Sequence, residues 1–146
     1  MRRIFSFSLS GKFAHFNFPF TNKKYLKKSY SLLPRTTLLG IFGAILGMNG
    51  FQNFNNRLPE YYQKLQHIPM SICLNNYLVK ELIKYNSLNS FADNSPNGDN
   101  VIMQEEILLN PKYRILLILD DSNEIDSKII SVLSEKNISF EILLKL

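Results

Sequence analysis

The last third of the chain constrains the fold most, because its apolar residues change from strand spacing to helix spacing and back. Residues 101–109 and 113–119 are two apolar runs of strand length, and the Asn-Pro-Lys sequence between them predicts a tight turn. Apolar residues then recur every three or four positions up to residue 137, and residues 138–146 return to an alternating pattern. This third therefore predicts strand, turn, strand, helix and strand.

The helix in this third carries its own start signal. Asp121 is followed three residues later by Glu124, which matches a capping box. We assign Asp121 to the helix cap rather than to a metal site with Asp120, because two carboxylates without a third acid hold a cation poorly. The apolar stripe of the helix consists of Ile125, Ile129, Val132 and Leu133.

The first third adds one strand and one helix. Apolar residues alternate with Ser over residues 4–9, as in a half-buried strand. Pro34, with the threonines after Arg35, suits the first turn of a helix that runs to about Met48. Glycines share one face of this helix, which permits close backbone approach and predicts that the helix lies flat on a sheet. They are Gly40, Gly43, Gly47 and Gly50.

The middle of the chain is the least regular part. We expect a strand within residues 68–74, a short helix at residues 78–84 and an exposed turn at residues 95–99. The order strand, helix, strand, strand, helix, strand predicts an α+β, ferredoxin-like fold, in which two helices cover one face of an antiparallel sheet. A length of 146 residues without an internal repeat predicts one such domain over residues 1–146, with a variable excursion at residues 51–100.

Charge is distributed unevenly along the chain. Residues 1–59 hold nine of the 17 Lys and Arg and none of the 12 acidic residues, so the two parts carry about +9 and −4. Within residues 11–33, lysines are interleaved with Phe and Tyr in a basic, aromatic loop. Because cations neutralise phosphates and aromatic rings stack on unpaired bases, this loop predicts a contact with single-stranded RNA. The alternative is a solvated basic loop that keeps the protein soluble.

Metal, cofactor and membrane functions have little support in the sequence. Cys73 is the single cysteine and the two histidines lie far apart, so we expect no metal and no cofactor. His15 and Tyr30 with a nearby lysine are residue types of an RNA-cleaving site, but phosphate contact or packing explains them better, and we expect no enzymatic activity. The longest apolar segment, residues 38–48, is about half the length of a membrane-spanning helix. We therefore expect no membrane contact and a cytoplasmic protein.

Three stretches together resemble one known family. They are FSLSGKFAHF at residues 7–16, YSLLPRTTLLGIFGAILG at residues 30–47 and EILLNPKYRI at residues 106–115. They are similar to the fifth family in the Cas series of CRISPR-associated proteins, the RAMP-type subunit of type I-B Cascade with an RRM/RAMP-like fold. The resemblance implies binding of the 5-prime handle of the guide RNA (crRNA) and docking on the Cascade backbone and large subunits.

The resemblance and the charge pattern together select a set of candidate RNA-binding residues. The set is Lys12, His15, Phe16, Lys23, Lys24, Lys27, Lys28, Tyr30, Arg35, Thr36 and Thr37. Members of the family are usually longer, with a larger excursion called the thumb and a glycine-bearing C-terminal segment. Two further hypotheses therefore stay open: a shortened, virus-encoded mimic that acts as an anti-CRISPR, and a generic ferredoxin-like interaction module.

Overall fold

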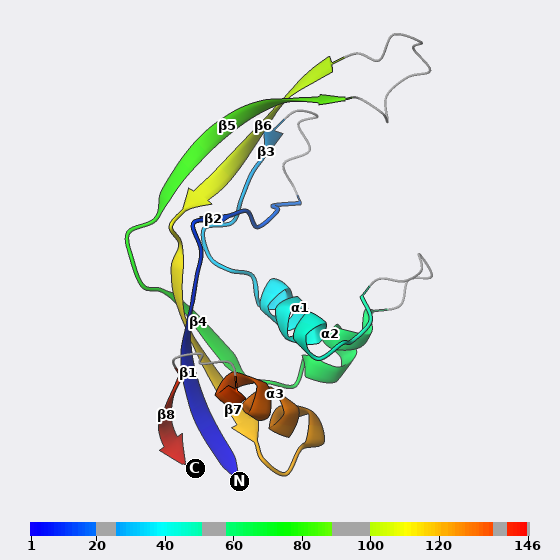
Figure 1. The fold of residues 1–146 in the computed structure, drawn as a ribbon, viewed down its shortest axis with the longest axis vertical. Helices are drawn as coiled ribbons and strands as arrows, with labels where there is room; N and C mark the ends of the chain where they lie inside the picture. Colours follow the sequence, from blue (N-terminus) through cyan, green and yellow to red (C-terminus); the bar gives the residue numbers. More distant parts are fainter. Residues whose placement is uncertain (20–25, 51–57, 89–99, 136–139, 146) are drawn as a thin grey trace. The chain divides into compact units, whose positions relative to one another are not determined.

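The computed structural model describes residues 1–19, 26–50, 58–88, 100–135 and 140–145 (Figure 1). The chain divides into two compact units, each built from segments that are distant in the sequence. Unit 1 consists of Met1–Ser10, Leu32–Asn76 and Lys112–Leu146. Unit 2 consists of Gly11–Ser31 and Tyr77–Pro111. The single domain expected over residues 1–146 stays a prediction.

Unit 1 contains a four-stranded antiparallel sheet with helices on one side (Figure 1). Its strands are β1 (Arg2–Ser10), β4 (Met70–Leu74), β7 (Lys112–Asp120) and β8 (Phe140–Lys145), in the spatial order β4-β7-β1-β8. Its helices are α1 (Arg35–Ile45), α2 (Glu60–Leu65) and α3 (Glu124–Glu135). The order β1, α1, β4, β7, α3, β8 confirms the predicted α+β, ferredoxin-like fold. The short helix α2 was not predicted.

The core of unit 1 lies between the sheet and the helices. In the register of β1 and β7, Phe5 lies opposite Leu117 and Phe7 opposite Ile115. Opposite residues of an antiparallel pair share a face, and all four of these side chains are buried. The ring of Phe7 meets Phe42 of α1 edge to face, with centroids 6.0 Å apart. The alternation of apolar residues with Ser, which predicted a half-buried first strand, therefore does mark a face that packs in the core.

Helix α1 begins after Pro34, whose carbonyl oxygen accepts hydrogen bonds from the N–H groups of Thr37 and Leu38 at 3.0 and 3.1 Å. The predicted glycine face does allow a close approach, but its partner is α2 rather than the sheet. A β-carbon at Gly43 would overlap the β-carbon of Tyr61, whereas one at Gly40 would lie 3.8 Å from the Tyr61 ring. Gly47 lies beyond the helix, with a φ of 69°.

The predicted cap of α3 is wrong. Asn123, not Asp121, caps the helix, because its Oδ1 accepts hydrogen bonds from the N–H groups of Ile125 at 2.9 Å and Asp126 at 3.3 Å. Asp121 instead forms an ion pair with Arg3 of β1. The cap therefore lies two residues later than predicted, and the helix begins at the next residue, Glu124. Its end at Glu135 agrees with the predicted end near residue 137.

Unit 2 is organised around one central strand, β6 (Asn100–Leu109). It pairs antiparallel with β5 (Val79–Leu88) and β2 (Phe13–Ala14), and parallel with β3 (Leu26–Lys27). Strands β5 and β6 form a long ribbon (Figure 1). The basic, aromatic segment thus holds short paired strands and an Asn17–Ser29 bridge rather than loop alone.

One expectation about this region is wrong, and another lies outside the described residues. The helix expected at residues 78–84 is part of β5, because ten consecutive residues pair with β6 and leave no buried helical face. Strands β6 and β7 exist as expected and belong to different sheets, and Asn110 in the connection between them has a φ of 48°. The turn at residues 95–99 lies outside the described residues.

The contact between Gly43 and Tyr61 gives the first prediction. Gly43→Ala should lower the free energy of unfolding by about 1–3 kcal/mol, because the new methyl group overlaps the Tyr61 side chain. Gly40→Ala is the matched control. It should leave stability unchanged or raise it by up to about 1 kcal/mol through helix propensity. Urea denaturation compares the two, and equal unfolding free energies would show that α1 and α2 do not pack here.

Candidate nucleic-acid interface

The structure divides the predicted RNA-binding residues between the two units. Unit 2 holds Lys12, His15, Phe16, Lys27, Lys28 and Tyr30. Unit 1 holds Arg35, Thr36 and Thr37, all in the first turn of α1. Lys23 and Lys24 lie outside the described residues. The candidate interface is therefore the part in unit 2.

Glu105 of β6 gathers three groups around one carboxylate. The hydroxyl of Tyr85 donates a hydrogen bond to its Oε2 at 2.9 Å, and Lys27 Nζ lies 3.9 Å from the same oxygen. His15 Nδ1 lies 3.3 Å from the other oxygen. The acid-free N-terminal segment thus acquires acidic partners from β6, which partly neutralise it.

Glu106, the next residue of β6, anchors the basic segment at Ser29. The buried N–H of Ser29 donates to Glu106 Oε2 at 3.1 Å, and Lys80 Nζ lies 3.4 Å from that oxygen. Lys80 Nζ also donates to the Ser29 carbonyl oxygen at 2.7 Å. His15 Nδ1 donates to the backbone carbonyl of Glu106 at 2.8 Å, so in the neutral ring Nε2 carries the lone pair. These contacts fix the shape of the segment.

Residues 16–18 and 28–30 form two arms of the basic segment, which pair with each other. Phe18 N donates to the Lys28 carbonyl at 2.9 Å and Tyr30 N donates to the Phe16 carbonyl at 2.8 Å. The rings of Phe18 and Tyr30 meet edge to face, with centroids 4.7 Å apart. Tyr30 therefore packs inside the segment, where it supports the arms in addition to any contact with a base.

The other cations in the described part of unit 2 face solvent. Lys12, Lys28 and Lys84 are exposed and form no ion pair with any residue in the described ranges. Lys84, Lys80 and Tyr85 come from β5, and the sequence reasoning missed them because that segment was expected to be a helix. Read as a strand, its Lys80 and Lys84 share one face, which is the signal that could have found them.

Arg35 is positioned for a structural contact. Its Nη2 donates to the carbonyl oxygens of Gln66 at 2.6 Å and Ile68 at 3.1 Å. The guanidinium thereby ties the start of α1 to the segment that follows α2. Thr36 and Thr37 beside it are exposed.

Comparisons with known proteins place the fold. No protein-family model and no curated protein matches the chain. A solved structure titled "CRISPR RNA-guided surveillance complex" contains a chain that matches with a TM-score of 0.54 and 10% sequence identity. The match covers 90% of this chain and 54% of that chain, so this chain spans about half the length of its structural neighbour. The two chains share a fold.

In the described parts of the chain, no cluster of three or more His, Cys, Asp or Glu side chains is suited to hold a metal ion. The helices described there are all too short or too polar to cross a membrane.

The anchoring role of Glu106 gives the second prediction. Glu106→Ala removes the acceptor of the buried Ser29 N–H, and an unsatisfied buried donor costs about 1–3 kcal/mol. Amides of residues 26–31 should therefore exchange with solvent about tenfold faster or more. Glu106→Gln keeps an acceptor oxygen and should show a smaller change, and exposed Glu81→Ala should show none. Equal exchange rates in all three variants would contradict the anchoring role.

Proposed function

We propose that the chain is a component of a CRISPR RNA-guided surveillance complex and binds the guide RNA through unit 2. The observation that carries the proposal is the shared fold with a chain of such a complex, over 90% of this chain. Two independent features support it. The resemblance of residues 7–16, 30–47 and 106–115 to a family of Cascade subunits points the same way, as does the basic, aromatic segment anchored on β6.

The finer assignment belongs to the same proposal. The chain takes the position of the type I-B subunit that holds the 5-prime handle of the crRNA, next to the backbone and large subunits. Lys12 and Lys28 contact phosphates because they are exposed and carry no acidic partner in the described ranges. Lys27 and His15 serve mainly to shape the segment, because Glu105 and Glu106 bind them. The chain acts by binding, without catalysing a reaction.

The assignment of Lys12 and Lys28 gives the third prediction. Log affinity for single-stranded RNA falls with log salt concentration by about 0.7 per neutralised phosphate. The Lys12→Gln, Lys28→Gln double variant should therefore reduce that slope by roughly 1.4 in fluorescence anisotropy titrations with a handle-sequence RNA. The Lys64→Gln, Lys128→Gln variant of unit 1 removes the same charge and should keep the wild-type slope. Identical slopes for the two double variants would show that Lys12 and Lys28 do not contact RNA.

The position in the complex gives the fourth prediction. Expressed in a type I-B strain that lacks its own handle-binding subunit, the chain should restore interference and copurify with the backbone and large subunits. The Lys12→Gln, Lys28→Gln variant should restore less, because the guide RNA is held more weakly. The Lys64→Gln, Lys128→Gln variant is the control, because it removes the same charge from unit 1. It should restore interference fully.

A second candidate function follows from the same shared fold. The chain matches a chain of such a complex over 90% of its own residues. A chain of this kind can occupy the subunit's place by mass action and block the complex, as an anti-CRISPR mimic would. Inhibition in a strain with a complete system, without rescue of the deletion strain, would establish the mimic and sink the subunit assignment. If neither rescue nor inhibition occurs, both assignments fail and a generic interaction module remains.

A further inference from the structure

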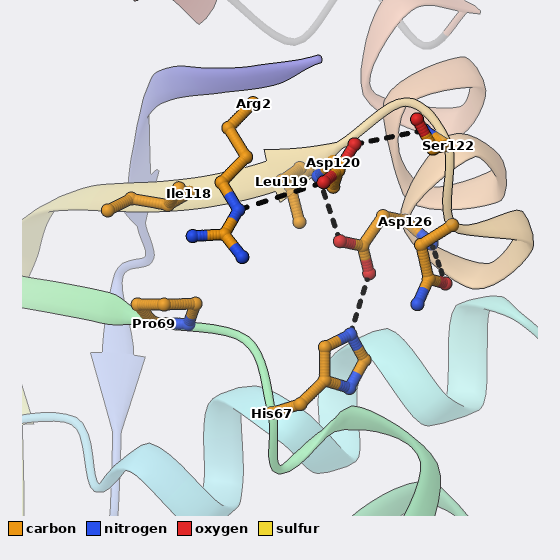
Figure 2. Close-up of a pocket in the computed structure, with 9 residues that line it drawn as sticks. Arg2, His67, Pro69, Ile118, Leu119, Asp120, Ser122 and Asp126 are labelled. Carbon is orange, nitrogen blue, oxygen red and sulfur yellow. Dashed lines mark hydrogen bonds and ion pairs between the residues drawn. The ribbon is translucent and has the colours of Figure 1, made fainter. Parts of the chain in front are cut away.

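A pocket in unit 1 is lined by charged side chains that are paired with one another (Figure 2). It has a volume of about 400 Å³. Buried Asp126 accepts a hydrogen bond from the backbone N–H of Asp120 at 2.9 Å, and His67 Nε2 lies 3.0 Å from its other carboxylate oxygen. Arg2 Nε lies 3.7 Å from Asp120 Oδ2. These contacts hold the end of β7, the start of α3 and the segment after α2 together, which is a structural role.

The outer edge of β5 in unit 2 is a feature of a different kind. Because β5 pairs with all ten residues of β6, the short strands β2 and β3 pair with the other side of β6, and β5 is an edge strand. The pairing of β5 with β6 is continuous, without a register shift. Within the described residues, no strand pairs with the outer side of β5. A long, regular edge presents a row of backbone N–H and C=O groups that can pair with another chain.

Apolar side chains of β5 are exposed on both faces of the strand. Val79 and Ile83 lie on one face with exposed fractions of 42% and 38%, and Leu82 lies on the other face with 50%. Natural edge strands are commonly protected by short length, by proline or by a bulge. Strand β5 is ten residues long and contains no proline, and its pairing has no bulge. Such an edge with exposed apolar side chains is typical of a surface that is covered in an assembly.

The charged side chains of β5 do not block this edge. Lys80 Nζ donates to the Ser29 carbonyl oxygen at 2.7 Å and lies 3.4 Å from Glu106 Oε2. The ammonium group is therefore turned toward β6 and away from the outer edge. Glu81 and Lys84 are exposed and have opposite signs. Their positions determine which register a pairing strand can adopt.

The strand is complementary to itself in one register. In an antiparallel pair with a two-fold axis, one residue lies opposite its own copy, and the residues on either side pair in mirrored order. Strand β5 spans Val79–Leu88, so the registers that pair most of it are centred on Ile83 or on Lys84. Centring on Lys84 would place two ammonium groups directly opposite each other, which is destabilising. Centring on Ile83 keeps like charges from lying directly opposite. The opposite pairs are then Lys84 with Leu82, Lys80 with Asn86 and Glu81 with Tyr85.

We propose that β5 pairs with β5 of a second copy of this chain, antiparallel and centred on Ile83. The pairing satisfies the outer backbone groups of both edges at once, and its two-fold symmetry closes the assembly as a dimer. The two exposed Ile83 side chains meet across the axis, and Leu82 packs on the aliphatic stem of Lys84 from the other copy. The contact uses unit 2 alone.

Disulfide crosslinking tests the register. Ile83→Cys in a Cys73→Ser background should form a disulfide-linked dimer on mild oxidation, because directly opposite residues have β-carbons about 4.5–5.5 Å apart, near disulfide reach. Glu81→Cys in the same background is the matched control, since Glu81 is exposed on the same face as Ile83. In the proposed register its two copies lie about 13 Å apart along the strands, so it should stay unlinked. Equal crosslinking of the two variants would overturn the proposal.

Sedimentation equilibrium of the full chain, without RNA, tests the association itself. The wild type should dimerise reversibly as its concentration rises. Ile83→Lys should raise the dissociation constant of the dimer at least about tenfold, because it places two ammonium groups opposite each other. Ile102→Lys is the matched control: Ile102 is 60% exposed but lies on β6, away from the edge, so the constant should change by less than about twofold. Circular dichroism verifies that both variants are folded.

Two results of this measurement would contradict the dimer. One is a wild type that stays monomeric at about 1 mM, where half of even a millimolar dimer would form. The other is an equal loss of association in the two lysine variants. The Lys12→Gln, Lys28→Gln variant should dimerise as the wild type does, so the outcome is independent of the guide-RNA proposal.

Discussion

The pairing of β1 with β7 is the constraint on which the rest of unit 1 depends. Nine residues of β1 lie in continuous antiparallel register with β7, from Arg2 opposite Asp120 to Ser10 opposite Lys112. This pairing places the apolar faces of both strands under the helices. It also leaves one free edge on each strand, which β8 and β4 occupy. A substitution that shifted this register by one residue would turn both apolar faces away from the helices.

The same register explains why polar chemistry gathers at one end of the sheet. Arg2 and Arg3 lie opposite Asp120 and Leu119, and Asp121 follows directly in the turn before α3. Charged groups that are 118 or more positions apart in the sequence therefore meet at short distance. The pocket with the oriented His67 forms at this end, because the turn that brings in Asp126 starts where β7 stops.

Unit 2 depends on pairing of a different kind. Its first segment lies between β1 and α1 in the sequence, and its second lies between β4 and β7. The central strand β6 belongs to the second segment, and the strands of the first segment pair with it, as β5 does. The basic segment therefore takes its shape from Glu105 and Glu106, which lie more than 70 positions away in the sequence.

Local periodicity was sufficient to predict the elements whose burial follows their own sequence. The alternation of Phe5 and Phe7 with serines predicted β1, and the spacing of Ile129 and Leu133 predicted α3, because these side chains do enter the core. The predictions that failed depended on distant partners. Residues 78–84 have a helical spacing of apolar side chains, but their backbone hydrogen bonds go to β6, and Val79, Leu82 and Ile83 stay exposed.

The candidate site was predictable to a similar degree and for the same reason. Composition was enough to locate the basic segment with Lys12 and Lys28, because a stretch of basic residues without acidic ones is visible in the sequence alone. It could not reveal that Glu105 binds His15 and Lys27, because the pairings of β2 and β3 with β6 are not visible in the sequence of either segment. The glycine face of α1 showed the need for close packing, but Tyr61 comes from a helix that the sequence did not reveal.

Two sets of basic side chains in this chain differ in how they are held. Lys12 and Lys28 are exposed point charges, so their attraction for phosphates is long-ranged and is screened by salt within about 10 Å. His67 is oriented by a buried carboxylate, whereas Arg2 is largely exposed and its Nε lies 3.7 Å from Asp120. Exposed lysines without an acidic partner suit a flexible polymer that presents many phosphates, because each can meet a phosphate without first giving up an ion pair. A histidine held by a buried carboxylate instead keeps one orientation, because the cost of ordering it has already been met in folding.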